Sequence, residues 1–183
     1  MDILEDIFEN VNNWLKFAES KNAVLITLSG VFIWGAIRII ASNKISLVFE
    51  WYFYSLIVFF AFSFIVGIFS FVPITNYSII IPSEDISEKD NLFLFSHLAK
   101  YRKKSLISKI SKITKTKESE VNEIHEMYAE QIIINSRITL HKFNYFSLGI
   151  KSILLGVSTP FLGYFLLNYI NCEKINLISG FRK

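Results

Sequence analysis

The sequence contains few of the residues from which metal and catalytic sites are built. Its single cysteine, Cys172, excludes an internal disulfide and a zinc site made of cysteines. The seven glycines are scattered and form no phosphate-binding loop. His125 and Glu126 begin a zinc-protease pattern, but Ala129 stands where the second histidine belongs. The other two histidines lack ligand spacing with carboxylates, so we expect no enzyme, no catalytic residue, no metal and no cofactor.

Charge is also missing from a long part of the chain, since no charged residue lies between Glu50 and Glu84. Apolar residues make up 52% of the chain and are concentrated in runs, which is typical of a membrane protein. Three runs, about 23–41, 51–72 and 148–170, are long enough to cross a bilayer as helices. We therefore predict an all-α fold: a helical membrane protein with about three transmembrane helices and a cytoplasmic helical insertion between the second and third.

Charge and hydropathy together divide the chain into five segments. We predict an amphipathic cytoplasmic helix at 1–22, two transmembrane helices within 23–73, a cytoplasmic helical sensor region at 74–147, a transmembrane helix at 148–170 and a tail at 171–183. The first segment is acidic and leads straight into the first span, unlike a signal peptide. Its apolar stripe at helical spacing consists of Ile3, Leu4, Ile7, Val11, Trp14, Leu15, Phe17 and Ala18.

The sensor region begins with a stretch, 83–117, that we expect to be polar and helical. Ser87 and Asp90 have the spacing of a capping box. A packing face follows them, made of Leu92, Phe95, Leu98 and Ala99.

The second half of this stretch, 100–117, carries only basic charges. The positive-inside rule then places this region and the N-terminus in the cytoplasm, in a multi-pass protein of the bacterial inner membrane. We interpret the basic run as a solvated face beside anionic membrane lipid, and we expect no nucleic acid partner.

A helical period continues unbroken from the charged segment into the last apolar run, which predicts one helix from about Glu118 to about Ile170. One stripe of this helix consists of Val121, Ile124, Tyr128, Gln131, Asn135, Ile138, Lys142 and Tyr145. Gln131, Asn135 and Lys142 are polar on a face that should be buried, which costs roughly a few kcal/mol for each unpaired group. These side chains either pair with one another and with neighbouring helices, or they bind a ligand.

Small residues mark faces on which the spans pack closely. They are Gly30 and Gly35 in the first span, and the pairs Ser152/Gly156 and Thr159/Gly163 in the last, where Pro160 predicts a kink. The packing is either within one chain or between subunits, and we expect a homo-oligomer.

The first and last spans run in the same direction if three spans are present, so their helices are parallel. Trp14 precedes Lys21 by the same interval that separates Asn135 from Lys142, about 10 Å of helix rise. If the two helices pack, these four residues lie at similar depth and form our candidate ligand site, in which the lysines attract an anion and Trp14 stacks on a base. Plainer roles remain open: Trp14 as an interfacial anchor, the lysines as snorkelling residues and Asn135 as a helix-packing residue.

Four sequence features in this order resemble the transmembrane effector domain of Pycsar, a bacterial antiphage system (the PycTM type). The stretch Asn-Trp-Leu-Lys-Phe-Ala-Glu-Ser-Lys at 13–21 runs directly into a span, and Asn-Leu-Phe-Leu-Phe-Ser-His follows at 91–97. Glu130-Gln131 and then Lys142 precede the last span. The resemblance covers roughly residues 10 to 170. Glu19 replaces the usual aspartate, and Asn22 separates Lys21 from the start of the span.

The resemblance implies a function and partners. A pyrimidine nucleotide cyclase triggered by phage makes cUMP or cCMP, and the effector senses this cyclic pyrimidine mononucleotide and impairs inner-membrane integrity, causing abortive infection. The resemblance transfers no ligand contacts to particular residues. Two alternatives belong to other classes: a small membrane channel or toxin that opens on another signal, and a membrane anchor that recruits a partner through the basic segment.

Overall fold

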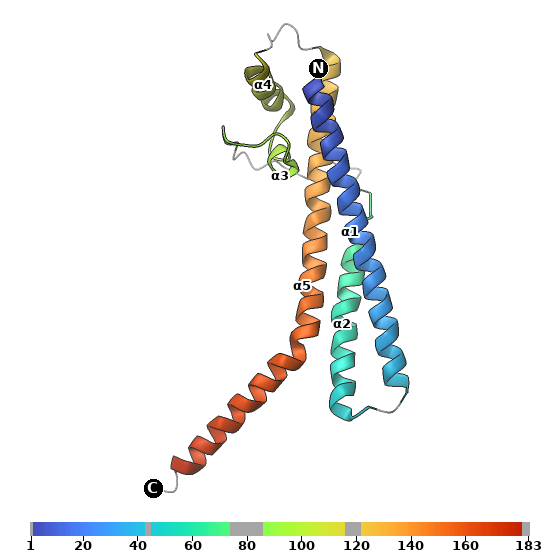
Figure 1. Cartoon of the computed structure of the whole chain (residues 1–183), viewed down its shortest axis with the longest axis vertical. Helices are drawn as coiled ribbons and strands as arrows, with labels where there is room; N and C mark the ends of the chain where they lie inside the picture. The colour runs from blue at the N-terminus through green and yellow to red at the C-terminus, as the bar shows by residue number, and fades with distance from the viewer. Residues whose placement is uncertain (1, 43–44, 74–85, 116–121, 181–183) are drawn as a thin grey trace. The chain divides into compact units, whose positions relative to one another are not determined.

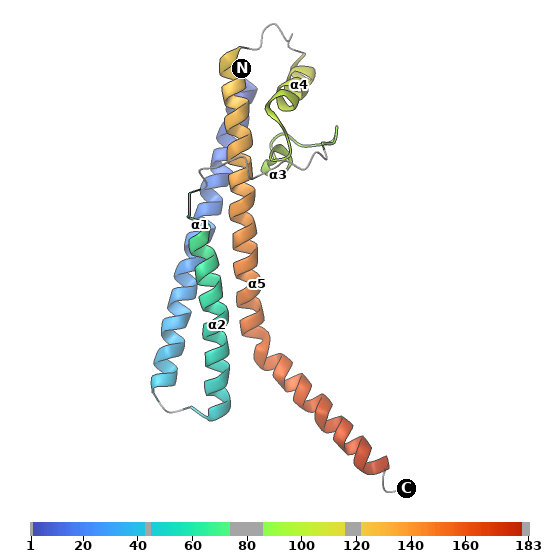
Figure 2. The same ribbon diagram turned by 180° about the vertical axis from the view of Figure 1, so that it is seen from behind.

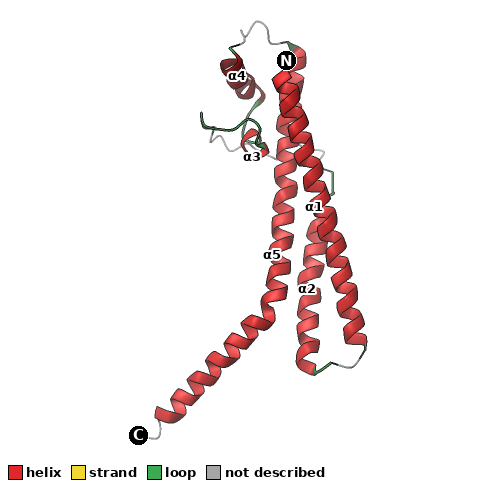
Figure 3. Cartoon of the chain, in the orientation of Figure 1, coloured by secondary structure: helices red, strands yellow, loops and turns green. Residues whose placement is uncertain are grey.

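In a computed structural model, the described residues are 2–42, 45–73, 86–115 and 122–180; the side chains of 2, 161–162 and 164–180 are not described. Every regular element in these ranges is a helix (Figure 3). The order is α1 (Asp2–Ala41), α2 (Leu47–Phe69), α3 (Phe95–Leu98), α4 (Lys103–Thr114) and α5 (Glu123–Gly180). The prediction of an all-α fold is confirmed.

The chain forms two compact units, and three helices, α1, α2 and α5, contribute to both. We call Met1–Val24 with Gly67–Ser147 the head unit, and Leu25–Val66 with Leu148–Lys183 the span unit. Helix α1 is unbroken, so the predicted amphipathic helix and the first span are one element. Helix α5 likewise belongs to both units.

Two helices among the described residues, α1 and α2, are long and apolar enough to cross a membrane. The α2 helix begins at Leu47, earlier than expected, because Leu47, Val48 and Phe49 before Glu50 are also apolar. It ends at Phe69. From Ser70 to Val72, just before Pro73, each backbone N–H donates to the carbonyl three residues earlier. The third predicted span, 148–170, falls in α5, where the side chains of 161–162 and 164–170 are not described, and it stays a prediction.

Within the span unit, small residues let the helices approach closely. The Ser29 and Ser63 hydroxyls are 3.3 Å apart, and the Ser152 hydroxyl donates to the carbonyl of Phe59 at 2.9 Å. Gly156 lies so close to Phe59 that an added Cβ would stand 2.8 Å from the Phe59 Cβ. Helix α5 contains Pro160, and its ribbon changes direction in the orange-to-red part (Figure 2).

The head unit has its own apolar core. Figures 1 and 2 show the beginning of α1 beside the beginning of α5, with α3 and α4 close to them. The buried residues come from all of these parts: Leu4, Ile7, Val11, Leu92, Leu98, Tyr101, Leu106, Ile110, Ala129, Ile132 and Ile133. The predicted stripe of the first helix therefore supplies part of this core, whereas Phe17 of that stripe is 47% exposed.

The stretch 83–117 is less helical than expected. Residues 83–85 and 116–117 lie outside the described residues, and α3 and α4 are the helices between them. The Ser87 N–H donates to the Asp90 carboxylate at 3.0 Å, and the Asp90 N–H donates to the Ser87 carbonyl at 3.1 Å. These two residues thus close a turn. Because no helix follows directly, the capping-box prediction was wrong.

The long helix begins and ends later than predicted. Its start is set by Asn122, whose side-chain oxygen accepts the His125 N–H at 3.0 Å, so α5 begins at Glu123. The expected start near Glu118 lies outside the described residues. At the other end α5 continues through the predicted tail as far as Gly180.

The buried stripe of α5 is also displaced from the predicted one. Ile124 of the predicted stripe is 50% exposed, whereas Ala129, Ile132, Ser136 and Thr139 are fully buried. The polar members of the real stripe are small, and Thr139 bonds the carbonyl of its own helix turn at 2.7 Å. The Thr139 hydroxyl is satisfied in this way, whereas the Ser136 hydroxyl is buried with no hydrogen-bond partner among the described atoms. An apolar pattern reveals the burial of neither residue.

Candidate functional site

The α1 and α5 helices pack in parallel in the head unit, as predicted. Asn12 contacts Asn135 at 2.8 Å, and Glu19 contacts Lys142 at 3.4 Å. The side chain of Asn22 reaches the backbone carbonyl of Lys142 at 3.0 Å. Later residues of α1 contact later residues of α5, and this order of contacts requires that the two helices be parallel.

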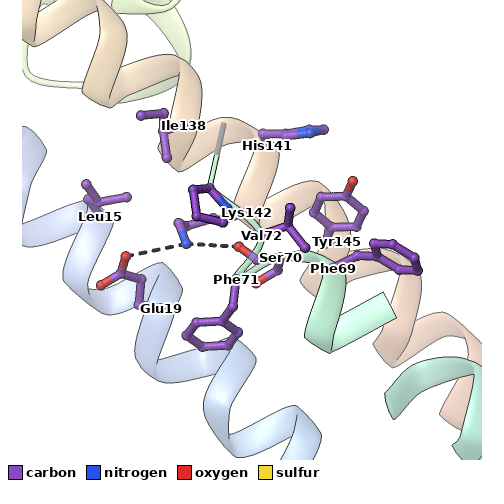
Figure 4. Close-up of a pocket in the computed structure, with 11 residues that line it drawn as sticks. Leu15, Glu19, Phe69, Ser70, Phe71, Val72, Ile138, His141, Lys142 and Tyr145 are labelled. Atoms are coloured by element: carbon purple, nitrogen blue, oxygen red, sulfur yellow. Dashed lines mark hydrogen bonds and ion pairs between the residues drawn. The ribbon is translucent and has the colours of Figure 1, made fainter. Parts of the chain in front are cut away.

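A pocket of about 470 Å³ lies where this helix pair meets the residues that follow α2 (Figure 4). We call it the Lys142 pocket. Its lining residues are Leu15, Glu19, Phe69, Ser70, Phe71, Val72, Pro73, Ile138, His141, Lys142 and Tyr145. The volume is in the range of small-molecule sites.

Lys142 is the enclosed cation of this pocket, with a side chain only 12% exposed. Its ammonium donates to the Ser70 carbonyl at 2.9 Å and lies 3.4 Å from a carboxylate oxygen of Glu19. The Phe71 ring centroid is 5.2 Å from the same nitrogen, a cation–π distance. Figure 4 shows Lys142 reaching between Glu19 and Ser70.

Ser70 supplies a polar group that the described residues leave unused. The residue is 4% exposed, and its hydroxyl is buried with no hydrogen-bond partner among the described atoms. An unpaired buried hydroxyl is costly, because water satisfied it in the unfolded chain. A ligand atom that accepted its hydrogen would remove this cost.

The remaining walls of the pocket are aromatic and apolar. The rings of His141 and Tyr145 have centroids 4.7 Å apart, one helical turn from each other on α5. Leu15 and Ile138 line the pocket from α1 and α5. Together with Phe71, these side chains can enclose a flat ring, while Lys142 binds an anionic group.

The other predicted site residues lie elsewhere in the head unit. The Trp14 ring packs on Phe95, at 5.4 Å between centroids, and on Phe143, at 6.3 Å. The Lys21 ammonium is 4.7 Å from the Phe17 ring centroid and 5.7 Å from that of Phe143. Trp14 and Lys21 thus share one aromatic cluster, whereas Lys142 lies in the pocket.

Asn135, the fourth predicted residue, takes part in helix packing. Its Nδ2 donates to Asn12, and its Oδ1 accepts from the Gln131 amide at 3.0 Å. Both ends of the Asn135 amide therefore have partners within the chain. Of the four predicted residues, Lys142 alone lines the Lys142 pocket.

Sequence reasoning missed Glu19, Ser70 and Phe71 as pocket residues. The sequence did contain a signal for Glu19. In a parallel pair of helices, an acid in this stretch of the first helix can neutralise Lys142. Ser70 had none, because 72 residues separate it from Lys142 along the chain. Such contacts come only from tertiary packing.

A second cavity, of about 580 Å³, lies between α4 and the preceding turn. Its inner lysine, Lys109, donates to the Ser87 carbonyl at 2.9 Å, the Asp90 carbonyl at 3.2 Å and the Tyr101 hydroxyl at 2.8 Å. Lysine has three donors, so this ammonium is satisfied without a ligand. The Tyr101 hydroxyl continues the network to the Asp90 carboxylate at 3.1 Å.

Two pKa values reflect this network. Burial raises the pKa of Asp90, but the Ser87 N–H, the Tyr101 hydroxyl and the charge of Lys100 outweigh it and hold the pKa below its usual value. Burial raises the pKa of Tyr101, opposed by the hydrogen bond from Lys109. The network therefore holds a carboxylate and an ammonium in place and is structural.

Part of the basic run is paired within the head unit. Lys103 lies 2.9 Å from Glu126, whose hydrogen bond and charge raise the pKa of the lysine. Lys112 lies 3.3 Å from Glu88. Among the described residues, no three histidine, cysteine, aspartate or glutamate side chains form a group that could hold a metal ion.

Comparison with known proteins identifies one family. A family model described as the Pycsar effector protein domain matches residues 3–168. No curated protein and no solved structure matches the chain.

Proposed function

The chain belongs to the Pycsar effector protein domain family, and from this premise we propose that it senses cUMP or cCMP and impairs the bacterial inner membrane. The match over residues 3–168 carries the proposal, since it includes the whole head unit after residue 2 and both candidate spans. The pairing with a pyrimidine nucleotide cyclase follows from the family role.

Helix continuity supports a link between sensing and membrane damage. The α1 and α5 helices each contribute residues to the head unit and to the span unit without a break. A ligand that repacks α1 against α5 in the head unit therefore acts on helices that continue as span residues. It changes the membrane only to the extent that it binds the active conformation more tightly than the resting one.

The proposed damage requires contacts with lipid and with other copies of the chain. The span unit exposes large apolar side chains, among them Val31, Trp34 and Val58, which suit a lipid environment. An added Cβ at Gly35 would meet nothing within 4 Å, so this small residue has room for a helix of another subunit. We propose a homo-oligomer that associates when ligand binds.

Co-expression with the partner cyclase tests this function. In bacteria that express the chain, a voltage-sensitive dye should report depolarisation with active cyclase and none with a catalytically inactive cyclase variant. Depolarisation without cyclase activity would favour a channel or toxin with another trigger. An intact membrane potential in both cultures would favour a membrane anchor, and either result contradicts the proposal.

A further inference from the structure

We propose that the Lys142 pocket binds the cyclic nucleotide, and that the Glu19 carboxylate is a built-in competitor that the ligand phosphate displaces. This inference rests on the proposed function and assigns its ligand site. It relocates the site from the predicted set to residues from three places in the chain: Glu19 on α1, Ser70 after α2 and Lys142 on α5.

Charge balance supports the exchange of Glu19 for a phosphodiester. Lys142 is enclosed, and its negative partner in the pocket is Glu19, 3.4 Å away. The Glu19 side chain is 45% exposed, so it can turn into water and keep its charge solvated. A cyclic phosphodiester carries one negative charge, as the carboxylate does, so Lys142 stays neutralised in both states.

Ser70 provides a second, independent reason to place a ligand here. Its buried hydroxyl has no partner among the described atoms, and it lies beside the carbonyl that Lys142 holds at 2.9 Å. A phosphate or sugar oxygen in the pocket can accept the Ser70 hydrogen while Lys142 binds the charge. The resting state therefore leaves one buried group unsatisfied that the ligand satisfies.

The aromatic wall fits the base. Tyr145 and His141 form a ring pair, and Phe71 faces the same ammonium from the segment after α2. A pocket of about 470 Å³ can hold a mononucleotide. The second cavity is a weaker candidate for the ligand site, because the Lys109 ammonium already has three acceptors.

The pocket also explains how binding reaches the spans. Lys142 holds the Ser70 carbonyl directly after the end of α2, and Glu19 holds Lys142 from α1. Displacing Glu19 therefore loosens an attachment between α1 and α5 at the end of α2. All three of these helices continue as span-unit residues.

Calorimetry on the full-length, detergent-purified chain tests the inference, with cUMP and cCMP as probes and cAMP and cGMP as comparisons. Lys142→Ala should weaken cUMP or cCMP binding by about tenfold or more, since it removes a charge-assisted hydrogen bond. Ser70→Ala should weaken it several-fold, by roughly one neutral hydrogen bond. Glu19→Gln should tighten it several-fold, because the amide keeps the size of the carboxylate and removes its charge.

Two variants serve as matched controls. Lys16→Ala removes an exposed lysine from the same helix as Glu19, and Glu9→Gln neutralises an exposed acid on it. Neither residue lines the pocket, so both should bind as the wild type does. The decisive readout is that Glu19→Gln should tighten binding while Lys142→Ala weakens it. General destabilisation would weaken binding in both variants.

Each contrary result is distinguishable. If the wild type binds and both Lys142→Ala and Glu19→Gln bind equally well, the ligand site lies elsewhere. The proposed function would then still stand. Weaker binding in Glu19→Gln would make the ion pair structural and overturn the competitor role. Failure of the wild type to bind cUMP and cCMP would overturn the proposed ligand, and this site with it.

Discussion

Asn12 of α1 and Asn135 of α5 are joined across the helix pair of the head unit by a hydrogen bond of 2.8 Å. Gln131 extends the contact by donating to the Asn135 Oδ1 at 3.0 Å. Asn135 is 9% exposed, so this amide chain is a polar interaction inside a helix interface. Removing its central member leaves partners unpaired.

Asn135→Ala should therefore lower the free energy of unfolding by about 1 kcal/mol, since it removes the partner of the half-buried Asn12, while the exposed Gln131 amide can turn to water. Thermal unfolding of the purified protein, followed by far-UV circular dichroism, measures the change. The exposed Asn13→Ala variant on α1 is the control and should unfold as the wild type does. An unchanged unfolding temperature for Asn135→Ala would mean that water replaces the lost contact.

Gly156→Ala should disrupt the packing of α5 on α2 in the span unit. The new Cβ would stand 2.8 Å from the Phe59 Cβ, an atom that moves only with its backbone. Such overpacking costs about 1–3 kcal/mol. Gly35→Ala is the matched control: its Cβ would meet nothing within 4 Å, so stability should stay equal or rise by up to about 1 kcal/mol. Equal unfolding temperatures for both variants would contradict this.

Arg137 attaches the α3–α4 connection to α5. Its Nε donates to the Ala99 carbonyl at 3.0 Å and its Nη2 to the Tyr101 carbonyl at 2.9 Å. Lysine cannot reproduce this fork, so Arg137→Lys should cost about 1–2 kcal/mol and Arg137→Ala should cost more. Hydrogen exchange should show faster exchange of α4 amides in both variants. Protection equal to that of the wild type in Arg137→Ala would rule out this attachment.

Asp90 should make the stability of the head unit depend on pH. Its folded pKa is held below the unfolded value of about 3.9, despite the opposing effect of burial. The carboxylate therefore contributes stability above the unfolded pKa and loses it as the pH falls through the folded one. Unfolding temperatures of wild type and Asp90→Asn, measured from pH 7 down to pH 3, should converge on acidification. A gap that stays constant over that range would contradict the expected loss of the carboxylate's contribution.

The sequence predicted the helices because their patterns are local. The apolar runs, the stripe of the first helix and Pro73 after the second span need no knowledge of the partner helix. The parallel order of α1 and α5 also follows from the chain, and the contacts Asn12–Asn135 and Glu19–Lys142 agree with it. The family resemblance, read from short motifs in order, is confirmed by the match over residues 3–168. Membrane orientation and the third span stay predictions.

The candidate site could not be read in the same way. A helical period places Asn135 and Lys142 on one stripe, but it does not say that the first packs on Asn12 while the second enters a pocket. Lys21 is close to Lys142 in the predicted register, yet its ammonium lies on the Phe17 ring. A rotation of a few tens of degrees about a helix axis decides between such neighbours, and only the partner side chains set it.

By itself, the sequence determined the helical class, the apolar spans and the family, because spacing, hydropathy and motif order are properties of the chain. Tertiary structure alone decided that Ser70, 72 residues away, meets Lys142, and that Glu19 rather than Lys21 lies beside it. The physical reason is that the enclosure of the Lys142 side chain depends on how α1, α2 and α5 pack against one another. A buried charge then pairs with the carboxylate that this packing brings within reach.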